Sequence, residues 1–129
     1  MLKTKKAFTL IELLIVIVII GILAVIVVGL VATNSRNRAN DARKKSDMRE
    51  IQTALEQFRV DNTDYPTTAQ GLALIVPNYL AAVPTSPDTN AYTYVQPAAG
   101  QYTLTVTLAN SQDNGPNVIA GVYTLTQKQ

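Results

Sequence analysis

Residues 3–32, KTKKAFTLIELLIVIVIIGILAVIVVGLVA, are the most hydrophobic stretch of this chain. The stretch starts with three lysines, has a single acid at Glu12, and contains only apolar residues and glycine from Leu13 to Ala32. As an α-helix, this last run would be about 30 Å long, which matches the hydrocarbon core of a bilayer. Because no proline, asparagine or aspartate interrupts it, we expect one membrane-spanning helix.

The composition argues against several classes of function. The chain has no cysteine and no histidine, so it lacks a disulfide framework, a thiolate nucleophile and the commonest general base and metal ligand. The formal net charge is +2, but it becomes −1 without the three lysines that precede the apolar run. We therefore expect neither an enzyme nor a broad basic surface for nucleic acid.

Two simple interpretations of the N-terminus leave something unexplained. A cleaved secretory signal has an apolar region of about 7–15 residues and a small-x-small cleavage site. This apolar run is longer, and a cut after Ala32 would put the bulky Leu30 where a small residue is needed. A plain membrane anchor fits the hydropathy but gives no reason for Glu12, because an ionised carboxylate in a dry environment is costly unless it is paired.

A third interpretation rests on a resemblance. Residues 5–24, KKAFTLIELLIVIVIIGILA, resemble the N-terminus of the type IV pilins and type II secretion pseudopilins. In that family a prepilin peptidase removes a short basic leader just before a phenylalanine and methylates the new amino group. The resemblance implies a leader over residues 1–7, cleavage between Ala7 and Phe8, and N-methylation of Phe8. Alanine stands at position 7, where the family usually has glycine.

The resemblance also implies a role for Glu12 as an assembly contact. Cleavage before Phe8 would create a new ammonium group. When the apolar helices of two subunits pack, Glu12 of one subunit could meet this group on its neighbour, which would fix the register of the helices. The alternative is that Glu12 lies in the first turn of its helix, near the lipid headgroups, where the helix dipole favours an acid.

The helical pattern continues beyond the apolar run. One apolar stripe with helical spacing is formed by Met48, Ile51, Leu55 and Phe58. We therefore expect one helix from about Phe8 to Asn62. Its hydrophobic half, residues 8–32, would be the membrane anchor and filament core, and the rest of the helix would belong to a globular domain of residues 33–129.

The apolar half of the expected helix contains two glycines. Gly21 and Gly29 each lower helix stability by about 1 kcal/mol relative to alanine. Filaments of the resembled family often loosen their helix in this region, which makes both glycines candidate hinges. Close packing of small residues in the membrane explains them equally well.

A basic segment comes after the apolar run. It contains Arg36, Arg38, Arg43, Lys44, Lys45 and Arg49. Counting these residues by the positive-inside rule would place the domain in the cytoplasm. The resembled family has its leader there and its domain outside, and we follow the family because the leader motif is the more specific signal. Acids interrupt the basic segment and aromatic residues do not, so we expect a solvated or inter-subunit face and no specific nucleic-acid site.

Residues 61–84, DNTDYPTTAQGLALIVPNYLAAVP, again resemble the family, and in particular the major pseudopilins. Within this stretch Thr67 and Gln70 have the spacing of a capping box, which predicts a short second helix that ends at about Ile75. Pro77 would stop that helix, and its apolar residues could pack on the stripe of the long helix.

The last third of the sequence has the period-two pattern of strands. We expect strands over residues 91–95, 101–108 and 118–126, joined as a three-stranded antiparallel meander. In the middle strand one face is apolar and the other carries threonines, and the stripe on the long helix would cover the apolar face. The expected fold class is thus α+β and pilin-like: one long N-terminal helix, a small antiparallel sheet and a short second helix.

One cofactor is implied by the resemblance alone. Major pseudopilins commonly hold a calcium ion in a C-terminal loop, and Asp88, Asp113 and Asn114 offer oxygen ligands here. Only two of these residues are acids, and they lie 25 residues apart in the sequence. We therefore expect an ordinary turn and neither a metal site nor another cofactor.

Taken with the family, these features predict a structural filament subunit. Its precursor would lie in the inner membrane with the domain outside the cytoplasm, and the assembled form would be a cell-surface or periplasmic filament. Its partners would be other copies of itself, the prepilin peptidase and the assembly machinery of the membrane. The motif YPTTAQGL and the absence of a C-terminal cysteine pair favour a secretion pseudopilus over a surface pilus. The alternative is a signal-anchored membrane protein whose small binding domain does not polymerise.

Overall fold

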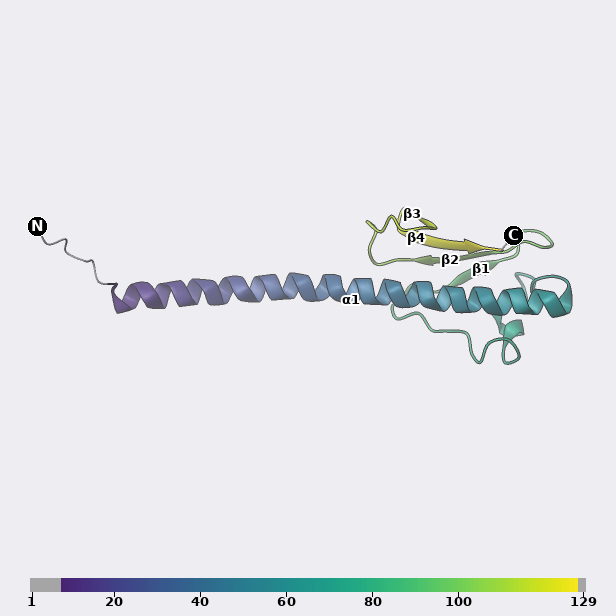
Figure 1. Cartoon of the computed structure of the whole chain (residues 1–129), viewed down its shortest axis with the longest axis horizontal. Helices are drawn as coiled ribbons and strands as arrows, with labels where there is room; N and C mark the ends of the chain where they lie inside the picture. Colours follow the sequence, from purple (N-terminus) through teal and green to yellow (C-terminus); the bar gives the residue numbers. More distant parts are fainter. Residues whose placement is uncertain (1–7, 128–129) are drawn as a thin grey trace, which may run out of the picture. The chain divides into compact units, whose positions relative to one another are not determined.

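The computed structural model describes residues 8–127 of the 129-residue chain, apart from the side chains of residues 30–32 (Figure 1). Its elements are α1 (Leu10–Asn62), η1 (Gly71–Ile75), β1 (Thr93–Val95), β2 (Thr103–Thr107), β3 (Val118–Ile119) and β4 (Val122–Thr126). One long helix, one short helix and one antiparallel sheet confirm the predicted α+β, pilin-like class. The chain forms two compact units, of which the first ends at Arg36 and the second begins at Asn37.

Helix α1 has nearly the bounds that its sequence predicts. It begins at Leu10, two residues after the expected start, and ends at Asn62. At the C-terminal end, Thr63 takes a φ of +69° and donates its N–H to the carbonyl of Arg59 at 2.9 Å. The amide of Asn62 donates to the carbonyl of Phe58, also at 2.9 Å. The first bond satisfies a carbonyl group that the last helical turn would otherwise leave unpaired, and the second adds a side-chain donor to the same turn.

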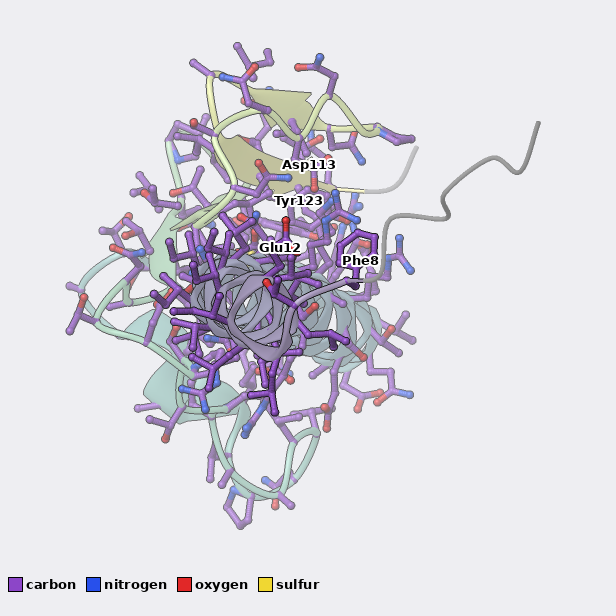
Figure 2. The ribbon with its side chains drawn as sticks, turned by 90° about the vertical axis from the view of Figure 1, so that its left-hand side faces the viewer. Phe8, Glu12, Asp113 and Tyr123 are labelled. Atoms are coloured by element: carbon purple, nitrogen blue, oxygen red, sulfur yellow. The ribbon has the colours of Figure 1, made fainter. Side chains whose placement is uncertain are left out.

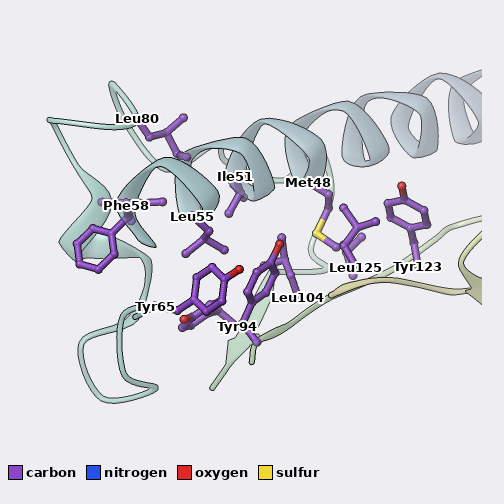
Figure 3. Close-up of a cluster of buried hydrophobic side chains, with 14 of the residues drawn as sticks. Met48, Ile51, Leu55, Phe58, Tyr65, Leu80, Tyr94, Leu104, Tyr123 and Leu125 are labelled. Carbon is purple, nitrogen blue, oxygen red and sulfur yellow. The ribbon is translucent and has the colours of Figure 1, made fainter. Parts of the chain in front are cut away.

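The predicted apolar stripe forms the helical side of the hydrophobic core. Met48, Ile51 and Leu55 are fully buried, and Phe58 is nearly so. They belong to one cluster with the inward side chains of the sheet, among them Leu104 (Figure 3). The sheet covers one side of the part of α1 that carries the stripe (Figure 1). Burial alternates along β2 as expected, with Leu104 and Val106 buried between threonines.

The sheet has four strands, so the prediction of three is wrong. The strand order is β1-β2-β4-β3, with every pair antiparallel. The segment 118–126, expected as one strand, folds back on itself as the hairpin β3–β4 with Ile119 opposite Val122. Both turn residues, Ala120 and Gly121, have positive φ angles of 50° and 76°. Two such residues suit the right-handed twist of a tight hairpin, which explains why the strand reverses there.

Gly121→Ala should destabilise the domain more than Gly100→Ala. Both glycines have positive φ, of +76° and +73°, so an added Cβ strains the backbone at each position. At Gly121 the new Cβ would also lie 3.2 Å from the Cα of Ser111, whereas at Gly100 it would meet nothing within 4 Å. We expect a loss of about 1 kcal/mol at Gly100 and more at Gly121. Thermal unfolding of both variants measures the difference, and equal losses would contradict this account of the turn.

The second helix is shorter than predicted and of another type. The capping box forms as expected: the N–H of Thr67 donates to the amide oxygen of Gln70 at 2.9 Å, and the N–H of Gln70 donates to the Thr67 hydroxyl at 3.3 Å. The helix that begins after this box is the five-residue 3₁₀-helix η1. The backbone of Val76, which precedes Pro77, is already extended. The helix is therefore too short for a regular series of α-helical hydrogen bonds. Ile75 is buried in the core, as predicted.

Candidate functional site

The start of α1 is closed by a capping box that the sequence analysis missed. The carboxylate of Glu12 accepts hydrogen bonds from the N–H and the hydroxyl of Thr9, both at 2.9 Å, and the N–H of Glu12 donates to that hydroxyl at 3.3 Å. The sequence pattern Thr-x-x-Glu at residues 9–12 is typical of a capping box and would have predicted this one. Phe8 precedes this turn and is 79% exposed. Figure 2 shows the side chains of Phe8 and Glu12 at this end of the helix.

The first part of α1 exposes apolar side chains on every side. Between Leu10 and Val28, the exposed fraction of the large apolar side chains lies between 49% and 82%. Within the described residues, α1 is the one helix apolar and long enough to cross a membrane, and its most apolar 18-residue window has a mean hydropathy of 3.6. Gly21 and Gly29 lie inside this helix, and a Cβ at either position would meet nothing within 4 Å. Ala7, the predicted residue before the cleaved bond, lies outside the described residues.

The basic segment differs from its prediction in one respect. Arg36, Arg38 and Arg49 are exposed, as expected of a solvated face. Lys44, however, is fully buried. Its Nζ donates to the carboxylate of Asp88 and, at 2.8 Å, to the carbonyl of Thr107. The expectation of a solvated face is therefore wrong for Lys44, because oxygen atoms of the domain replace the water around its ammonium group.

Asp41, one helical turn before Lys44, is also buried, with 3% of its surface exposed. Its carboxylate accepts the backbone N–H groups of Ala109 and Asn110 at 2.8 and 2.9 Å. The same carboxylate lies 3.9 Å from the ammonium group of Lys44. Asp41 thus ties α1 to the residues just after β2.

Lys45 faces the loop between β2 and β3. Its Nζ donates to the carboxylate of Asp113 at 2.6 Å and lies 5.7 Å from the centre of the Tyr123 ring. The hydrogen bonds from Lys45 and from the N–H of Gly115 hold the pKa of Asp113 below its usual value.

The two acids that the resemblance offers as calcium ligands, Asp88 and Asp113, each have a lysine partner. Burial by itself would raise the pKa of Asp88, but hydrogen bonds from Lys44, Asn90 and Ser86 outweigh it and lower that pKa. Across residues 8–127, no group of three or more aspartate, glutamate, histidine or cysteine side chains is placed to hold a metal ion. Asp88, Asp113 and Asn114 therefore do not fit the calcium site that the family resemblance implies.

Sequence reasoning also missed polar residues of α1 that bond to other parts of the domain. Glu56 accepts hydrogen bonds from the hydroxyls of Tyr65 and Tyr102 at 2.8 and 3.2 Å, and the side-chain amide of Gln52 donates to the carbonyl of Thr126 at 2.8 Å. Asp41 and Lys44 are two further examples. A signal for these two exists, because the alternating spacing of three and four residues in the apolar stripe, continued backwards from Met48, reaches Lys44 and then Asp41.

Two family models match the chain. The model described as the prokaryotic N-terminal methylation motif matches residues 2–28, and the model described as type II secretion system (T2SS), protein G matches residues 31–124. The chain belongs to the type II secretion system protein G family. Together the two matches cover most of the sequence, including most of α1 and of the sheet.

Curated relatives agree with this assignment to the protein G family. The type II secretion system core protein G of Klebsiella michiganensis is 31% identical to the chain over 98% of both sequences. The core protein G of Escherichia coli K12 is 35% identical over 78% of this chain and 79% of that protein. The core protein G of Vibrio cholerae is 30% identical over 94% and 92%. No solved structure matches the chain.

Membership of the protein G family confirms the predicted resemblance to the type II secretion pseudopilins. It also confirms the prediction of a filament subunit over that of an anchored binding module. The family is defined by a component of a secretion system and not by a catalytic activity. The cleaved bond between Ala7 and Phe8, the contact through Glu12, the hinges and the domain boundaries stay predictions.

Proposed function

We propose that this chain is the repeating subunit of a secretion pseudopilus, in which the apolar half of α1 leaves the membrane and becomes the filament core. The exposure of residues 10–29 on every side carries the proposal. A helix that is apolar all round is stable within lipid or among other helices, but not in water. A filament core of packed helices replaces one apolar environment with another, so leaving the membrane does not expose this surface to water.

The precursor then has a defined orientation. Residues 1–7 lie on the cytoplasmic side, residues 8–32 span the inner membrane, and residues 33–129 form the domain on the outer side. The prepilin peptidase cleaves between Ala7 and Phe8, and the assembly machinery moves the mature chain into a periplasmic filament. The relatives named as core protein G of type II secretion systems support this assignment.

Assembly gives Glu12 a charged partner. Thr9 supplies hydrogen bonds to the Glu12 carboxylate but no positive charge. The amino group that cleavage creates on Phe8 of a neighbouring subunit supplies that charge, and in a dry filament core an unpaired carboxylate would be strongly unfavourable. Gly21 and Gly29 act as hinges when the helix adjusts to the packing of the filament. Glycine suits this role because it loosens the backbone of a helix, and in the single chain a Cβ at either position would meet nothing within 4 Å.

Mass spectrometry of the N-terminal peptide tests the proposal. In assembled material we expect a chain that starts at Phe8 and carries one added methyl group. Intact Met1 in the assembled protein would refute the proposal, because the amino group of Phe8 would then not exist. The measurement needs filaments sheared from cells and a membrane fraction as the reference for unprocessed precursor.

Two substitutions at position 7 provide the matched control. Ala7→Gly introduces the residue that the family usually has there and should be processed at least as well as the natural chain. Ala7→Leu places a bulky side chain before the bond and should leave unprocessed precursor in the membrane. Equal processing of both variants would show that cleavage does not occur after residue 7.

A further inference from the structure

Two consecutive lysines of α1 hold two different loops of the domain. Lys44 binds Asp88, which lies in the loop before β1, and Lys45 binds Asp113, which lies in the loop between β2 and β3. These two aspartates are the acids that could have served as calcium ligands. Each loop therefore already has a positive charge next to its acid, and that charge comes from the helix.

The ammonium group of Lys44 has surroundings like those of a bound metal cation, because it is buried among oxygen atoms. Its side chain is 0% exposed, and the side chains of Asp41 and Asp88 are 5% and 23% exposed. The ammonium group has three oxygen neighbours, from Asp88, from the carbonyl of Thr107 and, at 3.9 Å, from Asp41. A buried ammonium group needs such partners, and the buried Asp41 is in turn held by two backbone N–H groups. The buried charges of Lys44 and Asp41 thus each have partners within this network.

Lys45 forms the more exposed half of the arrangement. Its side chain and that of Asp113 are 23% and 22% exposed, and the ion pair is 2.6 Å long. The second oxygen of Asp113 accepts the N–H of Gly115 at 2.9 Å. A Cβ on Gly115 would come within 3.0 Å of that oxygen and 3.5 Å of the Lys45 Nζ, so the loop is closely fitted around the pair. Both oxygens of Asp113 are therefore engaged by groups of this chain.

We propose that the ammonium groups of Lys44 and Lys45 are the cations that fasten these two loops to α1, so that the folded domain does not depend on calcium. A calcium ion would need six to eight oxygen ligands from carboxylates, carbonyl groups and water, and it would have to compete with the lysines for the carboxylates. Here the carboxylates of both loops are neutralised from the helix. The proposal concerns the folded domain and holds whether or not the chain assembles into a filament.

Thermal unfolding of the full chain in detergent tests the calcium part of the proposal. We expect the same midpoint in millimolar calcium chloride and in excess chelator. A calcium site filled at 100 times its dissociation constant would raise the midpoint by roughly 10–20 °C. Any rise of several degrees on addition of calcium to the natural chain would overturn the proposal, and magnesium chloride serves as the control for ionic strength.

Substitutions of Lys44 and Lys45 test whether their ammonium groups fasten the two loops to α1. Lys45→Met should lower the midpoint by a few degrees, and Lys44→Met should lower it further because Asp41 and Asp88 then lose a buried partner. Because Lys44→Met could prevent folding, the double variant Lys44→Met with Asp88→Asn provides a second measurement and should regain part of the loss. Arg49→Met, at an exposed position of the same helix, is the matched control and should leave the midpoint unchanged. If Lys44→Met and Lys45→Met unfold at the natural midpoint, the proposal is wrong.

Discussion

Glu12→Gln should prevent incorporation of this chain into filaments even though the first turn of α1 keeps its capping box. Glutamine can accept the same hydrogen bonds from Thr9 that glutamate accepts. It lacks the negative charge that the amino group of Phe8 on a neighbouring subunit would require. We expect the yield of sheared filaments to fall by about tenfold or more, because the same charge pair is lost at every subunit contact. Quantitative blotting of filament and membrane fractions measures the effect.

Thr9→Ala is the reciprocal control for Glu12→Gln. It removes the hydroxyl that hydrogen-bonds with Glu12 but keeps the carboxylate and its charge. Loss of an N-terminal cap costs about 1 kcal/mol and loosens the first turn only. We expect Thr9→Ala to be processed and to assemble. The opposite pattern, in which Glu12→Gln assembles and Thr9→Ala fails, would show that Glu12 serves the helix terminus and not the subunit contact.

Leu55→Ala should produce a large loss of domain stability, because Leu55 is a fully buried member of the apolar stripe. Leu55 is 0% exposed and lies in the cluster between α1 and the sheet (Figure 3). Removing its branched side chain leaves a cavity that well-packed neighbours fill only in part, at a cost of about 2–5 kcal/mol. For a domain of this size we expect the unfolding midpoint to fall by about 10 °C or more. Differential scanning calorimetry of the full chain in detergent measures the fall.

Val60→Ala is the matched control on the same helix. Val60 is 84% exposed, so its truncation removes little packing and should change the free energy of unfolding by no more than about 0.5 kcal/mol. A comparable loss in both variants would mean that Leu55 does not lie in the core of the folded domain. The two variants together also test the prediction that one face of this helix is covered and the other is not.

The local sequence pattern was sufficient to predict those elements whose structure depends mainly on hydrophobic burial. The apolar run of α1 and the spacing of Met48, Ile51 and Leu55 depend on hydrophobic burial, which is periodic and therefore visible in a sequence. The same holds for the alternation of β2, where Leu104 and Val106 face the core. Pattern was insufficient for the hairpin β3–β4, because the reversal at Ala120 and Gly121 depends on two backbone angles and the flanking residues read as one continuous strand.

The candidate sites divide in the same way. The sequence by itself determined the family, the apolar helix, the face of that helix that covers the sheet, and Phe8 and Glu12 as the residues to test, because each of these depends on neighbours along the chain. Only the tertiary structure decided that Lys44 is buried and that Lys45 and Lys44 hold Asp113 and Asp88. The partners in these pairs lie 68 and 44 residues apart, so the charges are brought together by the packing of the loops on α1 and not by any local rule.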